Sequence, residues 1–173
     1  MKWVTVLILC FFMSDEIVIF NKDSTLEWRV INDTVMGGES SSSVILNEEK
    51  HLLFTGQVST ENNGGFAMVR TMTNVKLNES NKRIVLKLKG DGKQYQLRLK
   101  SSENQRYWYV HNFKTNTKEE EIILQLADFY PSYRGRKLNK KNFSDFKIKE
   151  MAILIGNKKN EKFSLEIESI TIR

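Results

Sequence analysis

The sequence predicts an all-β protein, a β-sandwich of jelly-roll type, and three observations carry this prediction. Short runs of branched and aromatic residues recur along the chain, each about as long as a β-strand. Polar and glycine-containing stretches typical of turns separate these runs. No long stretch repeats its apolar residues every three to four positions, as an amphipathic helix would. Many short strands without long helices favour two packed sheets.

The 173 residues are enough for one domain with a sizeable core. We expect this domain over residues 17–173, after an apolar segment over residues 1–16. A single helical turn is expected within residues 144–150. The expected strands lie at residues 17–20, 26–31, 44–46, 51–58, 66–75, 83–89, 95–100, 107–113, 119–126, 151–155 and 165–172.

Alternation and turn chemistry also predict how some strands pair. The runs at 83–89 and 95–100 alternate apolar and polar residues on either side of Gly90-Asp91-Gly92, which predicts a hairpin. Residues 51–58 are expected to pair with the strand before them. The continuous apolar run at 151–155 is typical of a central strand. Near the end of the chain, the inward positions slip by one residue at Glu168–Ser169, which predicts a β-bulge.

The N-terminus is apolar after a positively charged start. Met1 and Lys2 precede a nearly wholly apolar run from Trp3 to Met13, which resembles a secretory signal or a membrane anchor. A strand or helix packed on the domain is the alternative. The sequence therefore slightly favours export or membrane association over a cytoplasmic location.

The net charge of +6 is modest, and basic residues cluster only between Arg134 and Lys149. We interpret this cluster as a solvated loop; a patch for anionic lipid, nucleic acid or an acidic partner is the alternative. No RNA-binding signature or helix-turn-helix pattern accompanies it. We therefore expect no nucleic-acid partner.

Few residues in this chain are suited to catalysis or metal binding. Cys10 is the only cysteine, and His51 and His111 are the only histidines, so disulfides, a cysteine nucleophile in the domain and a zinc site are not expected. The glycine pairs match neither a phosphate-binding loop nor a dinucleotide-binding fold. The sequence therefore predicts no catalytic residue, no metal and no cofactor.

Two glycine pairs at strand ends are the most distinctive feature. Asp33-Thr34-Val35-Met36-Gly37-Gly38 follows one expected strand, and Asn63-Gly64-Gly65-Phe66 precedes another, which reaches Arg70. Glycine permits a positive φ or the close approach of another group. Alternation places Arg70 on the same face as Phe66, so we expect Arg70 to be partly buried and to need a carboxylate partner.

These residues allow two interpretations. In the first, a ligand such as a sugar or a peptide backbone binds to polar side chains, with Trp28 or Trp108 as a stacking platform. In the second, which the residue types favour, the glycines form left-handed turns and Asp33 bridges backbone amides or pairs with an arginine. The polar residues of the first interpretation are Asp33, Asn63, Arg70, Asp91, Tyr95, Arg134 and Arg136.

Several motifs occur together and in a fixed order along the chain. They are Trp28 followed by Val30-Ile31-Asn32-Asp33-Thr34-Val35-Met36-Gly37-Gly38, then Phe54-Thr55-Gly56, Asn63-Gly64-Gly65-Phe66-Ala67 with Arg70, Gly90-Asp91-Gly92 with Tyr95, Leu97-Arg98-Leu99, Asp128-Phe129, Arg134-Gly135-Arg136, Ile153-Leu154-Ile155 and Phe163-Ser164-Leu165-Glu166-Ile167. From about Ile17 to Arg173, this set resembles the complex I intermediate-associated protein family.

The resemblance implies a galactose-binding-like jelly roll without enzymatic activity. Mitochondrial relatives are assembly factors for NADH:ubiquinone oxidoreductase, so it implies a protein partner, such as part of a membrane-associated complex. A carbohydrate-binding module, which shares this fold, is the alternative, with a carbohydrate as partner. An enzyme or cofactor binder that depends on Asp33 is the third hypothesis. We expect Asp33 to organise loops first and to touch a partner second. The binding residues implied by the family motifs are Asp33, Met36, Gly37, Gly38, Asn63, Gly64, Gly65, Phe66, Arg70, Asp91, Tyr95, Arg134 and Arg136.

Overall fold

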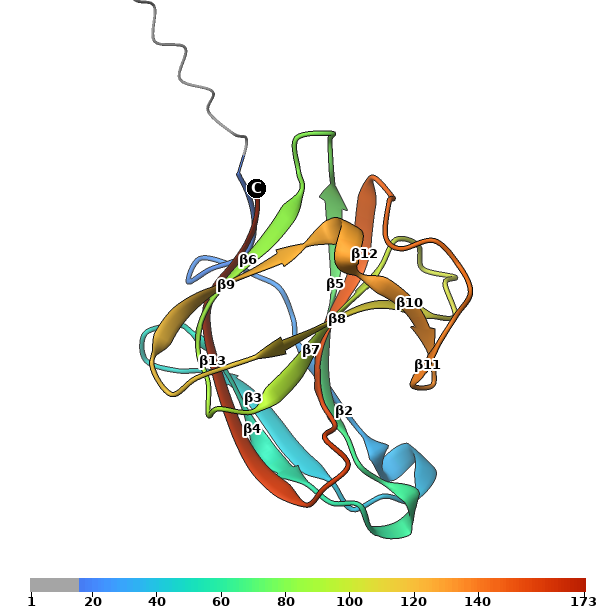
Figure 1. The fold of residues 1–173 in the computed structure, drawn as a ribbon. Helices are drawn as coiled ribbons and strands as arrows, with labels where there is room; N and C mark the ends of the chain where they lie inside the picture. The colour runs from blue at the N-terminus through green and yellow to red at the C-terminus, as the bar shows by residue number, and fades with distance from the viewer. Residues whose placement is uncertain (1–15) are drawn as a thin grey trace, which may run out of the picture.

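The computed structural model describes residues 16–173, which form two antiparallel β-sheets packed on one another (Figure 1). The six-stranded sheet has the order β3-β4-β13-β6-β9, and β1 pairs with β13 beside this path. Its strands are β1 (Ile17–Phe20), β3 (Ser41–Leu46), β4 (Leu52–Val58), β6 (Arg83–Lys89), β9 (Glu119–Gln125) and β13 (Glu161–Ile172). This arrangement confirms the predicted all-β sandwich.

The seven-stranded sheet has the order β11-β10-β8-β7-β12-β5-β2. Its strands are β2 (Arg29–Asn32), β5 (Ala67–Lys76), β7 (Gln94–Lys100), β8 (Trp108–Lys114), β10 (Tyr130–Tyr133), β11 (Arg136–Lys137) and β12 (Lys147–Ile155). Three short 3-10 helices, η1 (Asp33–Met36), η2 (Glu61–Asn63) and η3 (Leu126–Asp128), lie in connections between strands.

Most of the expected apolar segment, residues 1–15, lies outside the described residues. Between residues 16 and 173, no helix is long and apolar enough to cross a membrane.

The core lies between the two sheets because alternate side chains of each strand point inward. Leu97 and Ile153 contribute from the seven-stranded sheet, and Phe54 and Leu165 from the six-stranded sheet; all four are fully buried. Phe54 and Phe163 pack edge to face, with ring centroids 4.7 Å apart. Burial of these apolar side chains is the main force that holds the sheets together.

Several predicted pairings are confirmed. β3 pairs with β4 over Ser41–Leu46, and β12 lies between β5 and β7 as a central strand. The register of β13 against β6 shifts between Ile167 and Ser169, where a bulge is predicted.

The predicted hairpin at Gly90-Asp91-Gly92 is wrong. β6 pairs with β13 and β9, whereas β7 pairs with β12 and β8, so this turn carries the chain from one sheet to the other. Both strands still alternate, because each has one face toward the shared core. The alternation of the strands and the residues of the turn therefore do not distinguish a hairpin from a connection between two sheets.

Two smaller expectations also need correction. The helical turn expected within residues 144–150 is wrong, because β12 begins at Lys147 and Ile148 is fully buried in an extended segment. The strand expected at 26–31 is shorter and starts at Arg29.

The seven-stranded sheet has a second, smaller apolar cluster on its outer face. Met68, Ala152 and Leu154 are buried there and form a cluster separate from the main core. Ile31, Phe66 and Trp108 pack against them. The outer face of this sheet is therefore more than a solvated polar surface.

Candidate functional site

Asp33 is a fully buried carboxylate at the end of β2, in the first turn of η1. Its Oδ1 accepts a hydrogen bond from the Ser40 amide (3.1 Å), and its Oδ2 accepts one from the Ser40 hydroxyl (2.5 Å). Oδ2 also accepts bonds from the amides of Gly65 (2.6 Å) and Phe66 (3.2 Å). Asp33 therefore joins the loop after β2 to the loop before β5, and both loops lie at the end of the sandwich away from the C-terminus (Figure 1).

The glycines of both loops allow this approach. A Cβ on Gly38 would lie 2.4 Å from the Asp33 Cγ, and one on Gly64 would lie 2.7 Å from the Asp33 Oδ2. Gly37 and Gly65 have φ values of 87° and 131°, which L-residues rarely adopt. Each glycine pair thus combines one position of positive φ with one position that the Asp33 side chain closely approaches.

The surroundings of Asp33 set its charge state. Burial raises the pKa of this carboxyl, but the bonds donated by Ser40, Gly65 and Phe66 lower it, and the net pKa lies below the ordinary value. Asp33 is therefore ionised at neutral pH and acts as an acceptor for its own loops.

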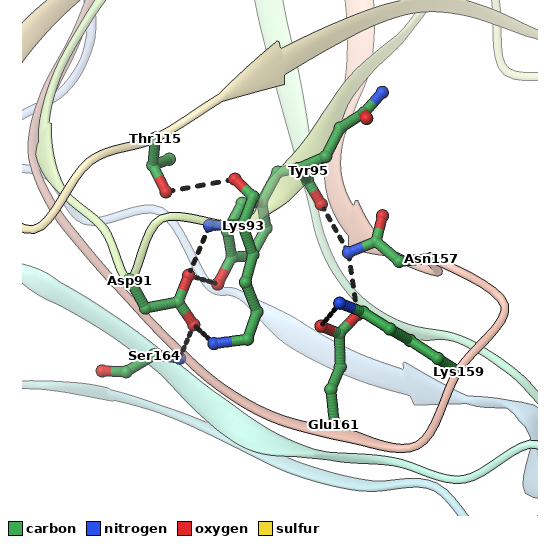
Figure 2. Close-up of polar contacts among 9 residues, drawn as sticks. Asp91, Lys93, Tyr95, Thr115, Asn157, Lys159, Glu161 and Ser164 are labelled. Atoms are coloured by element: carbon green, nitrogen blue, oxygen red, sulfur yellow. Dashed lines mark hydrogen bonds and ion pairs between the residues drawn. The ribbon is translucent and has the colours of Figure 1, made fainter.

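Asp91 makes a second connection of this kind, shown in Figure 2. Its Oδ1 accepts bonds from the Lys93 amide (3.2 Å) and the Tyr95 hydroxyl (3.1 Å). Its Oδ2 accepts from the Lys93 ammonium (2.9 Å) and from the Ser164 amide on β13 (2.9 Å). Asp91 thus ties the connection between β6 and β7 to the six-stranded sheet.

Tyr95 belongs to this cluster through its hydroxyl and to the core through its ring. Burial and the Asp91 carboxylate raise the pKa of the Tyr95 phenol far above its usual value, so the hydroxyl stays protonated and donates to Asp91. The ring stacks on Phe113 with centroids 5.9 Å apart.

Arg70 is partly buried and has a carboxylate partner, as predicted, and this partner is Glu150. The Arg70 guanidinium donates to the Glu150 Oε1 at 3.0 Å, and the Lys100 ammonium lies 2.7 Å from its Oε2. The Glu150 side chain is only 6% exposed. These groups line a cavity of about 420 Å³ on the outer face of the seven-stranded sheet, together with Glu27, Arg29, Thr71, Met72 and Glu103.

Arg134 and Arg136 lie at the turn between β10 and β11, where both are exposed. The Arg134 guanidinium lies over the Tyr133 ring, 5.5 Å from its centroid. β11 and β2 form opposite edges of the seven-stranded sheet. These arginines are therefore remote from Asp33.

A sequence model of the family described as complex I intermediate-associated protein 30 (CIA30) matches residues 18–167. The chain belongs to the CIA30 family. No curated protein matches it.

Solved structures similar to this CIA30 chain include carbohydrate-binding modules. A family 11 module from Clostridium thermocellum, solved with a β-1,3-1,4-mixed-linked tetrasaccharide, has a TM-score of 0.65 and 13% identity over 91% of this chain and 94% of that one. A family 30 module of a cellulosomal cellulase from the same organism has a TM-score of 0.62 and 14% identity over 91% of this chain and 96% of that one. At such identities the likeness shows the fold, a jelly roll of the galactose-binding type.

The structure distributes the predicted residues of the CIA30 chain over four places. Asp91 and Tyr95 form one pair, Arg70 stands with Glu150, and the two arginines of the β10–β11 turn stand apart. Met36 is described only by its backbone, at the end of η1. The remaining place is the Asp33 clasp, whose two loops contain Asp33, Met36, Gly37, Gly38, Asn63, Gly64, Gly65 and Phe66.

Sequence reasoning missed several residues that complete these sites. Ser40 supplies two of the bonds to Asp33, and Glu150 holds Arg70 and Lys100 together. No local pattern marks either residue, because each meets its partner only through the fold. Arg98 falls inside a family motif and alternation turns it away from the core, yet its neighbours on the other strands follow only from the strand register.

One group of side chains is of the types that bind metal ions. Side-chain atoms of Glu49, His51 and Glu166 lie within 4.8 Å of one another. The His51 Nδ1 lies 2.9 Å from the Glu166 Oε1, which also accepts a bond from the side-chain Nδ2 of Asn47 at 2.9 Å. These protein contacts account for the arrangement.

Proposed function

We propose that this CIA30 protein is a non-enzymatic assembly factor that binds a protein partner during formation of a multisubunit complex, NADH:ubiquinone oxidoreductase being the complex that the family implies. The observation that carries the proposal is the burial and hydrogen bonding of Asp33, the first residue of the most distinctive family motif. The carboxylate of the segment from Asp33 to Gly38, that of Asp33, is fully buried and accepts four bonds from its own loops. A carboxylate so engaged cannot reach a substrate, which supports a structural role for this segment within a non-enzymatic binding module.

Carbohydrate binding is the second candidate. It is favoured by the fold and by the planar amide side chains of Gln96 and Asn112 on the outer face of the seven-stranded sheet. Both tryptophans proposed as stacking platforms are engaged within the protein. The Lys100 ammonium lies over the Trp108 ring at 4.4 Å from its centroid, and Trp28 packs edge to face on Phe20. A glycan array would test this candidate, and we expect no sugar to bind.

The test of the assembly role is deletion of the gene in the source organism, followed by native electrophoresis of membrane complexes. We expect less mature NADH:ubiquinone oxidoreductase and an accumulated subassembly, with recovery when the gene is restored. A tagged protein should migrate with the subassembly and be absent from the mature complex. Unchanged amounts of mature complex in the deletion strain would contradict the proposal.

A further inference from the structure

Three arginines stand in one row across the outer face of the seven-stranded sheet. Residues paired directly across antiparallel strands point to the same face, so the strand register defines the row. Neighbouring strands lie about 4.8 Å apart, which makes a row of six residues about 24 Å long. From β2 to β10, the row consists of Arg29, Arg70, Ala152, Arg98, Val110 and Tyr130.

The arginines in this row are incompletely neutralised. Arg29 and Arg70 are directly opposite one another, an arrangement of like charges that destabilises a sheet. Each has one carboxylate, Glu27 at 3.5 Å from Arg29 and Glu150 at 3.0 Å from Arg70. Among residues 16–173, no carboxylate pairs with Arg98, whose Nε and one terminal nitrogen donate to the Gln96 Oε1 at 3.0 and 2.6 Å.

Arg98 is oriented and charged. Burial lowers the pKa of its guanidinium to about 10, so it remains a cation at neutral pH. Gln96 in turn donates to Asn112 at 2.9 Å, and Asn112 donates to the Tyr130 hydroxyl at 3.3 Å. The Lys137 ammonium lies 5.4 Å from the centroid of the Tyr130 ring. These hydrogen bonds orient the Arg98 guanidinium, and Lys137 adds another cation at the edge of the sheet.

The row has apolar neighbours on both sides. On one side, the buried Met68 and Leu154 lie two residues along their strands from Arg70 and Ala152. In the other direction Met72 is 54% exposed, beside the cavity that Arg70 and Glu150 line. The face therefore offers both cationic forks and apolar surface.

We propose that this outer face, from Arg29 to Lys137, binds an extended acidic segment of the partner protein, with Arg98 pairing one of its carboxylates. The proposal rests on the assembly role above and specifies the chemistry of the partner. The planar guanidinium of arginine can donate two parallel bonds to a carboxylate. Gln96 takes bonds from the Nε and one terminal nitrogen of Arg98, so the other terminal nitrogen has donors left for such a ligand. About seven extended residues span the row at about 3.4 Å each.

A polypeptide fits this face better than other anions do. Its acidic side chains can meet the arginines while an apolar side chain covers the exposed Met72. A sulfated or uronic polysaccharide supplies charge without an apolar counterpart, and a bilayer headgroup layer would not favour a single row of forks. The observed mixture of cationic and apolar side chains is therefore the basis for choosing an acidic protein segment.

The test measures binding of a fluorescein-labelled peptide of alternating glutamate and alanine to the purified full-length chain by anisotropy. The same peptide with glutamine in place of glutamate is the charge control. We expect the acidic peptide alone to bind, and binding to weaken as NaCl is raised, because salt screens the contacts. Arg98→Gln should weaken binding at least tenfold, and Arg98→Lys should have a smaller effect because it keeps the charge but loses the fork.

Arg83→Gln, an exposed arginine of β6 in the other sheet, is the matched control and should bind like the wild type. Thermal unfolding verifies that each variant is folded; if Arg98→Gln does not fold, Arg98→Lys provides the comparison. The proposal is overturned if the acidic peptide does not bind, if Arg83→Gln weakens binding as much as Arg98→Gln, or if heparin or anionic vesicles bind more tightly through Arg98. Because the assay uses a defined peptide, its failure leaves the deletion phenotype intact, so the two proposals can fail separately.

Discussion

At the scale of single residues, the motif carboxylate Asp33 has a structural role that its neighbours define. All four of its described hydrogen bonds come from two loops of its own chain. The sequence interpretation that Asp33 bridges backbone amides agrees with this geometry. The identity of Ser40 as its main partner could not be predicted, since it depends on how the loop folds back after Gly38.

Replacing Asp33 should therefore affect stability. Asp33→Asn should lower the free energy of unfolding by about 2–4 kcal/mol, because an amide nitrogen cannot accept the bonds made to one oxygen and leaves buried donors unpaired. Urea unfolding at neutral pH measures this loss. Asp23→Asn, at an exposed turn, is the control and should change stability by less than about 0.5 kcal/mol. Equal losses of stability in both variants would contradict a stabilising role for the Asp33 hydrogen bonds.

The same carboxylate predicts a pH dependence. Its pKa is lower in the folded chain than in the unfolded one, so its contribution is complete above the unfolded value of about 4 and declines as pH falls through the folded value. The stability difference between the wild type and Asp33→Asn should therefore shrink on going from pH 6 to pH 3. Denaturation at both pH values measures it, and a difference that grows at pH 3 would contradict this assignment.

At the scale of elements, the connection between β6 and β7 shows what sequence patterns could and could not predict. The two strands are located within one residue of their expected bounds. Their pairing is wrong in the prediction, because alternation reports which side faces the core and says nothing of which sheet a strand joins. The hydrogen bond from the Ser164 amide to Asp91 joins the β6–β7 connection to β13, a contact that no local pattern predicts.

Asp91 and Tyr95 should be energetically coupled across this connection. Asp91→Asn is expected to cost about 1–3 kcal/mol and Tyr95→Phe about 1 kcal/mol, since each removes part of a shared set of hydrogen bonds. The double variant should lose less than the sum, by about 0.5–1 kcal/mol. A double-mutant cycle in urea measures the coupling. Strict additivity would show that the Tyr95–Asp91 bond contributes nothing.

At the scale of the whole molecule, the residues that stabilise the fold lie apart from the surface that we propose binds a partner. The clasp and the Asp91 cluster stabilise loops and sheets, while the outer face of the seven-stranded sheet carries cations and apolar side chains. The family and the fold could be predicted from ordered motifs along nearly the whole chain. The arginine row could not, because it is assembled from strands that are distant in sequence and adjacent only in the sheet.

Glu150 links stability to the charge of this face. Glu150→Gln removes the buried carboxylate that Arg70 and Lys100 share, so we expect a loss of about 1–3 kcal/mol. The face then carries more positive charge, and the acidic peptide should bind more tightly. Glu103→Gln, an exposed residue lining the same cavity, serves as the control for charge without a broken pair. Weaker peptide binding to Glu150→Gln would contradict an anion-binding face.

Zero-length carbodiimide cross-linking in cells of the source organism tests whether an acidic partner protein binds the outer face of the seven-stranded sheet, because this reagent joins lysine amines only to carboxylates in contact with them. We expect cross-links from Lys137, an exposed lysine at the edge of the seven-stranded sheet, to aspartate or glutamate residues of one partner protein. Cross-links to that partner confined to Lys87, Lys89 and Lys162 of the six-stranded sheet would contradict binding at this face.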